Sequence, residues 1–279
     1  MPGSIFAQLQ RIDNRYIYLL LIMSLMAPFL LPLGLPVPVT QSTRAVYDTI
    51  ESVPAGSKVL FCWDTTSGVY AELGPQGIAV LQHLVSKSAK IYAVGFANEE
   101  SQTLVEMQMR PKVDMSGKKY GEDYVNLGFY AGTEVSMAAF ASDVQKLVRK
   151  DYYGTPVESI PMMKQVSTAR DFSLLVLIAG GEQMATYLRQ FHAPYKIKFV
   201  AGTQAVLYPT WLPYVSSGQV AGLLNGLVAA AEYEILIRKF GVGVASADAL
   251  SMSHLLIVAF IALGNMGYFY DRSRKGGAK

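Results

Sequence analysis

Two long uncharged stretches lie near the ends of the chain and enclose a middle part in which apolar and polar positions alternate. No residue from 16 to 43 is charged, and a second uncharged stretch covers residues 249–270. Because a helix rises about 1.5 Å per residue, roughly 20 apolar residues cross the hydrocarbon core of a bilayer. We therefore predict transmembrane helices at residues 16–39 and 248–270. The first stretch ends in LPLGLPVPV without a small-residue cleavage site, which favours an uncleaved signal anchor.

In the middle part, residues 40–247, short apolar runs alternate with longer runs of helical period. The apolar runs predict strands at residues 58–64, 90–96, 124–130, 172–181 and 196–202. Helical spacing predicts helices at residues 42–52, 77–86, 101–110, 133–150, 182–191 and 217–239, and residues 208–218 are expected to form a loop. Continuously apolar strands that alternate with helices are typical of a parallel sheet covered on both faces. We predict an α/β fold with a doubly wound, mostly parallel sheet of about five strands, flanked by an N-terminal and a C-terminal transmembrane helix.

Composition narrows the class of protein. Hydrophobic residues make up 51% and charged residues 16% of the chain, whereas about 25% is charged in an ordinary soluble domain. A net charge of only +3 excludes a dedicated nucleic-acid binder. One cysteine and three histidines exclude a disulfide framework and make a metal site of several such ligands unexpected. We expect no cofactor, no metal and no nucleic acid, and a lipid bilayer as one partner.

Residues 40–247 carry equal numbers of basic and acidic residues. The excess of positive charge therefore lies in the two short tails. Short positively charged flanks remain on the cytoplasmic side of a membrane. We therefore predict a double-pass protein of the cell membrane with both termini in the cytoplasm. Residues 1–15 would form a cytoplasmic interfacial segment, residues 40–247 an extracytoplasmic α/β domain, and residues 271–279 a basic cytoplasmic tail.

Motifs for catalysis are absent from the sequence. It contains no G-x-S-x-G, H-E-x-x-H, Walker loop or G-x-G-x-x-G. Cys62 lies in an apolar strand and is interpreted as a packing residue, while His83 and His192 are interpreted as structural. In open α/β sheets, ligands bind at the carboxyl ends of the strands. The weak ligand-binding candidates at these ends are Asp64, Thr66, Ser67, Gly68, Gly180, Gly181, Glu182 and Thr203. The alternative is that they form tight turns and helix caps only.

Small and polar residues in two helical segments indicate surfaces for packing against other helices. Gly222 and Gly226 are spaced as in G-x-x-x-G, and small residues also recur in the second apolar stretch. Polar side chains inside a bilayer are costly and are expected to face protein. The candidates for helix packing are Gly222, Gly226, His254, Asn265, Gly264 and Gly267.

Four strings resemble, as a set, a family of prokaryotic membrane proteins with one anchor helix at each end. They are LPLGLPVPV, KKYGEDYVNLGFYAG, DYYGTP and SGQVAGLLNGLVAAAEYE. The resemblance implies a prokaryotic source and the two-span plan. It implies no activity, cofactor or catalytic residue.

Three hypotheses for function remain. The first is a non-catalytic, doubly anchored structural or scaffold subunit of a larger membrane assembly, with other membrane subunits or further copies of itself as partners. The second is a membrane-tethered ligand-binding or sensor domain that uses the crevice at the strand ends. The third is a membrane-anchored hydrolase with Asp64 or Glu182 as its acid or base, which needs a second titratable group within hydrogen-bond reach. Of these hypotheses, the sequence favours those without catalytic activity.

Overall fold

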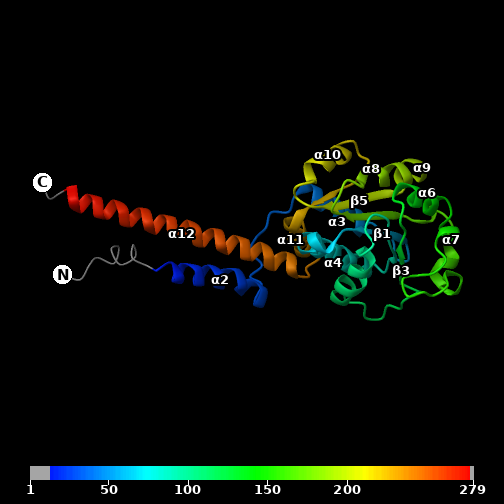
Figure 1. Cartoon of the computed structure of the whole chain (residues 1–279), viewed down its shortest axis with the longest axis horizontal. Helices are drawn as coiled ribbons and strands as arrows, with labels where there is room; N and C mark the ends of the chain where they lie inside the picture. Colours follow the sequence, from blue (N-terminus) through cyan, green and yellow to red (C-terminus); the bar gives the residue numbers. More distant parts are fainter. Residues whose placement is uncertain (1–12, 277–279) are drawn as a thin grey trace. The chain divides into compact units, whose positions relative to one another are not determined.

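The computed structural model describes residues 13–276 and divides into two compact units (Figure 1). One unit comprises Val37–Gly243. The other contains the described residues up to Pro36 together with those from Val244 onward. The first is an α/β domain, and the second contains the apolar helices from both ends of the chain.

Six strands in the described part of the chain form one parallel sheet in the order β3-β2-β1-β4-β5-β6. The strands are β1 (Lys58–Asp64), β2 (Lys90–Gly95), β3 (Tyr124–Phe129), β4 (Leu174–Ala179), β5 (Lys198–Thr203) and β6 (Leu223–Asn225). The chain winds outward from β1 to β3, returns to β4 beside β1, and then winds the other way. The α/β class and the doubly wound parallel sheet are therefore confirmed, with six strands where about five were expected. The order of strands reverses between β1 and β4, where such sheets form their crevice.

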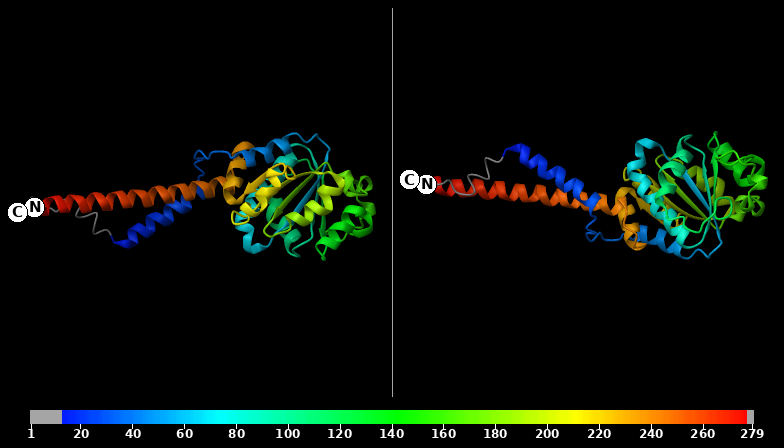
Figure 2. Two further views of the ribbon diagram at one scale, coloured as in Figure 1. Left: turned by 90° about the horizontal axis from the view of Figure 1, so that it is seen from above. Right: turned by 90° about the horizontal axis from the view of Figure 1, so that it is seen from below.

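Helices cover both faces of the sheet (Figure 2). On one face lie α3 (Gln41–Glu51), α4 (Tyr70–Ser86), α5 (Ser101–Leu104) with the π-helical turn Val105–Met109, and α11 (Gly226–Leu236). On the other lie α6 (Glu134–Ser142), α7 (Val144–Leu147), α8 (Met184–Tyr187) with the π-helical turn Leu188–His192, α9 (Ala193–Tyr195) and α10 (Tyr208–Ser216). Short 3-10 turns occupy Ser67–Val69, Arg110–Lys112, Val157–Ser159, Pro161–Gln165 and Ala169–Asp171. Alternate residues of each strand point to opposite faces, so the domain has two hydrophobic cores.

Three of the sequence predictions for elements of the α/β domain are wrong. The loop expected at residues 208–218 is mostly helix α10, and β6 interrupts the helix expected at residues 217–239. β6 has only three residues, too few for a pattern of period two to stand out from the helical spacing of its neighbours. The helix expected at residues 133–150 ends at Ser142, because Asp143 is extended and caps the separate helix α7.

One helix among the described residues is long and apolar enough to cross a membrane. It is the Val242–Tyr270 part of α12 (Val242–Gly276), and it begins six residues before the predicted start at residue 248. The first apolar segment forms the 17-residue helix α2 (Asn14–Leu30), which is shorter than such a span. Residues 32–39 are not helical, so the helix predicted for residues 16–39 is too long at its end. Pro32, Pro36 and Pro38 account for this, because proline lacks the donor that a helix needs.

Candidate functional site

Asp64 ends β1 at the point where the strand order reverses, and its carboxylate is enclosed by protein. Oδ1 accepts hydrogen bonds from the backbone N–H groups of Phe96 (2.7 Å) and Ala97 (3.0 Å). Oδ2 accepts a hydrogen bond from the hydroxyl of Tyr187 in α8. Asp64 and Tyr187 are both 0% exposed. The carboxylate therefore joins β1 to the loop after β2 and to a helix on the opposite side of the reversal point.

Burial dominates the electrostatics of this group. It raises the pKa of Asp64, while the hydrogen bonds from Tyr187 and from the backbone lower it. Burial also raises the pKa of Tyr187 and of the neighbouring Cys62. Phe96 and Phe191 pack against the Tyr187 ring. Tyr187 is the second titratable group that the hydrolase hypothesis requires, but neither it nor Asp64 meets solvent, and proton transfer to a substrate needs direct reach.

The other candidates at the strand ends differ in exposure. Thr203 is buried and its hydroxyl donates to the carbonyl of Ala179 (3.0 Å), the residue that pairs with Asp64 across β1 and β4. Glu182 is exposed. Ser67 and Gly68 are also exposed, whereas Thr66, Gly180 and Gly181 are half-buried.

Glycines at these strand ends allow close packing. A Cβ on Gly180 would lie 2.9 Å from the side chain of Val69, and one on Gly202 would overlap the side chain of Gln76. Neighbouring side chains thus occupy the space beside these two glycines. A contact of a ligand with Asp64, Thr66, Gly181 or Glu182 stays a prediction.

The helix-packing candidates separate into two groups. Gly222 lies in the loop before β6, and Gly226 is the first residue of α11, where its φ is +55°. They do not lie on one helix, so the two glycines form no helical G-x-x-x-G face, and their role in packing against other helices stays a prediction. His254, Gly264, Asn265 and Gly267 are all on α12, where Gly267 is buried and the other three are exposed.

The sequence predictions missed three buried carboxylates. Each accepts hydrogen bonds from backbone N–H groups of a segment at an end of the α/β domain or within the helical unit. Asp248, in α12, accepts hydrogen bonds from the backbone N–H groups of three consecutive residues, at 2.7 Å, 2.9 Å and 2.9 Å: Leu33, Gly34 and Leu35. Glu232 accepts from the backbone N–H and the hydroxyl of Thr40 (3.0 Å and 2.7 Å). Glu234 accepts from the N–H groups of Gly241 (2.8 Å) and Gly243 (2.9 Å). An acidic residue in an apolar helix was the only signal available in the sequence.

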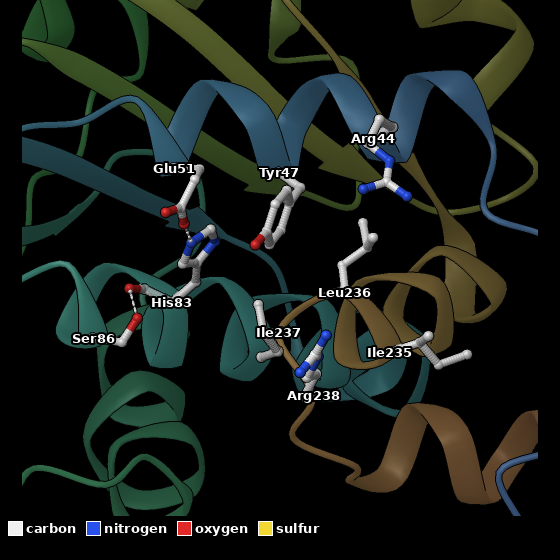
Figure 3. Close-up of a pocket in the computed structure, with 9 residues that line it drawn as sticks. All are labelled: Arg44, Tyr47, Glu51, His83, Ser86, Ile235, Leu236, Ile237 and Arg238. Carbon is white, nitrogen blue, oxygen red and sulfur yellow. Dashed lines mark hydrogen bonds and ion pairs between the residues drawn. The ribbon is translucent and has the colours of Figure 1, made fainter.

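A separate cavity of about 560 Å³ lies between α3, the end of α4 and the end of α11, and we call it the α3–α4–α11 cavity (Figure 3). It is lined by Arg44, Tyr47, Glu51, His83, Ser86, Ile235, Leu236, Ile237 and Arg238. His83 is buried, and one ring nitrogen contacts the hydroxyl of Tyr233 while the other contacts Glu51, both at 2.8 Å. Burial lowers the pKa of His83, although Glu51 acts in the opposite direction. The structural role predicted for His83 agrees with these contacts.

No protein family model matches this chain, and neither a curated protein nor a solved structure matches it.

Proposed function

We propose that this protein is a membrane-anchored, non-catalytic subunit of an oligomeric membrane assembly. The observation that carries the proposal is the exposed face of α12, which places two polar side chains, His254 and Asn265, on a helix of membrane-spanning length. A polar group facing lipid is costly, and such groups normally face protein.

The two polar residues lie on the same side of the helix. They are eleven positions apart, which is about three turns. Together with Val258, Ile261 and Tyr268 they repeat at spacings of four and three, the pattern of a helix that packs against a parallel partner. We call these five residues the α12 stripe, and all five are exposed. Ala249, Ser253 and Gly267 are buried and lie outside the stripe, which no residue of the described range covers.

The proposed partner at this face is a second copy of the chain. All copies inserted in one membrane share an orientation, so two α12 helices meet in parallel and identical residues meet at the same depth. A twofold dimer places equivalent residues next to one another. The Asn265 amide carries both donors and an acceptor and can pair with its own copy. A buried polar pair of this kind also fixes the register of two helices.

The proposal includes two membrane passages with both termini on the cytoplasmic side. Asp248 supports this plan, because it joins the segment after α2 to the first turns of α12 and makes the two helices neighbours within one unit. The 17 residues of α2 extend only about 26 Å against about 30 Å of hydrocarbon. The uncharged residues that follow α2 would complete the first passage.

Cysteine cross-linking of the full chain in native membranes tests the assembly. The only native cysteine, Cys62, is 0% exposed and gives a silent background. We expect I261C, on the α12 stripe, to form a disulfide-linked dimer on mild oxidation. M266C is the matched control, because Met266 is similarly exposed (54% against 59%) but lies off the stripe.

Replacing Asn265 distinguishes a specific α12 dimer from cross-linking by random collision of neighbouring chains. We expect N265L in the I261C background to reduce the dimer at least several-fold, since leucine removes both the hydrogen bond and the cost of facing lipid. Equal cross-linking of I261C and M266C, or none in either, would contradict the proposal.

A further inference from the structure

The α3–α4–α11 cavity has an unusual charge arrangement for a surface depression. Arg44, on α3, and Arg238, just after α11, extend into it from opposite sides (Figure 3). Neither guanidinium forms an ion pair or a hydrogen bond with a residue in the described range 13–276. The one lining carboxylate, Glu51, is already engaged by Lys87 (2.9 Å) and His83 (2.8 Å). The two arginine charges therefore remain for a ligand.

The backbone conformation at Arg238 is a second, independent observation that points to a ligand in this cavity. Its φ is +54°, the left-handed conformation that ends a helix and that usually holds glycine. The N–H groups of Arg238 and Lys239 close the end of α11 by donating to the carbonyls of Ile235 (3.1 Å) and Glu234 (3.0 Å). A side chain at this position crowds the following carbonyl, so arginine here is unfavourable for the fold alone. Its guanidinium, however, extends into the cavity.

Apart from the two arginines, the side chains that line the cavity are aromatic, aliphatic or already hydrogen-bonded. Tyr47 stacks on the His83 ring, with 4.8 Å between ring centroids, and both nitrogens of His83 already have partners. Leu236 and Ile237 supply an apolar wall between the two arginines. The cavity thus combines two cations with aromatic and aliphatic surface, and its size is typical of a site for a small molecule.

We propose that the α3–α4–α11 cavity binds a phosphate ester, with Arg44 and Arg238 holding the phosphate oxygens and Leu236 and Ile237 contacting the organic part. Guanidinium groups pair well with phosphates. A tetrahedral phosphate presents oxygens in several directions and can accept from two arginines on opposite walls, whereas the two oxygens of a carboxylate lie in one plane. The source is either the headgroup of an anionic lipid or a soluble phosphate ester. Arg238 lies four residues before the start of α12, so a headgroup is within the reach of the chain.

The test uses the full chain in nanodiscs and follows its thermal unfolding through Trp63 and Trp211, which are both buried. One arm compares nanodiscs of phosphatidylcholine alone with nanodiscs that also contain phosphatidylglycerol. The other adds glycerol 3-phosphate to the phosphatidylcholine nanodiscs. A rise in Tm with phosphatidylglycerol alone identifies the headgroup as the source, and a rise with glycerol 3-phosphate identifies a soluble ester. Either rise supports the site.

R238G is the decisive variant, because glycine suits the left-handed backbone and the fold is therefore retained. We expect R238G without ligand to unfold at the same temperature as the unchanged chain or higher, and to lose the rise in Tm given by the phosphate compound. R44Q should weaken binding at least tenfold. K239Q is the control, since it removes an adjacent exposed charge that does not line the cavity. No rise in the unchanged chain, or an equal rise in R238G and K239Q, would overturn the proposal.

Discussion

At the scale of single residues, burial decides which polar groups hold the fold. His83 is enclosed between α3, α4 and α11, and its two nitrogens are used by Glu51 and the hydroxyl of Tyr233. Since burial penalises the imidazolium, the pKa of His83 is lowered from its ordinary value of 6.5. The unfolded chain, in which the ring is solvated, binds a proton more readily than the folded one. Stability from this group is therefore complete above pH 6.5 and decreases as the pH falls below that value.

We predict that acidification from about pH 8 to about pH 5.5 lowers the free energy of unfolding through His83, by at most about 1.4 kcal/mol, since pH 5.5 lies one unit below the ordinary pKa of the ring. H83Q keeps a donor and an acceptor but does not titrate, so the difference between its two values should be smaller by that amount. Denaturant unfolding of the full chain in detergent at the two pH values measures it. An identical pH dependence in both proteins would show that the His83 ring is not responsible.

At the scale of elements, backbone groups without regular partners are satisfied by carboxylates that come from far along the chain. The N–H groups of Leu33, Gly34 and Leu35 lie beyond the end of α2 and have no helical partner. A buried N–H without an acceptor is costly, and Asp248, which is 0% exposed, meets all three. Over this short stretch, the Asp248 carboxylate accepts the hydrogen bonds that backbone carbonyls accept in a helix.

We predict that D248A frees the segment after α2 and costs about 3 kcal/mol, because three donors lose one charged acceptor. D248N keeps one carbonyl oxygen and should have a smaller effect. Limited proteolysis in detergent, with cleavage sites mapped by mass spectrometry, should show faster cutting at residues 32–39 in the order D248A, D248N, unchanged chain. Equal rates in all three would mean that the contact with Asp248 does not hold this segment.

How much the sequence predicts differs between elements for physical reasons. Long strands with continuous apolar residues, such as β1 and β4, were located to within a residue or two, and from them the parallel sheet followed. β6 was missed because three residues carry no period of their own. Asp64 was expected at a strand end, but its enclosure by Tyr187 depends on a residue more than a hundred positions away.

At the scale of the whole molecule, the functional proposals depend on contacts that a linear pattern cannot contain. Arg44 and Arg238 lie almost two hundred residues apart and meet only because α3 and α11 cover the same face of the sheet. His254 and Asn265, by contrast, are predicted from the sequence alone, because they are polar residues within an uncharged apolar stretch. Local periodicity predicts a surface on one helix, whereas a cavity between three helices requires the order of the strands.

The pair Glu232 and Glu234 has a mechanical consequence for the α/β domain. Two residues apart on α11, they hold the first segment of the domain through Thr40 and its last segment through Gly241 and Gly243. A tension applied between the two ends of the α/β domain, residues 37 and 243, therefore loads these hydrogen bonds first, and α3 and α11 after them. The central strands β1 and β4 are pulled only when both helices have detached. Stretching of the domain is thus taken up first by the hydrogen bonds and helices at its two ends, before the central strands of the sheet carry any load.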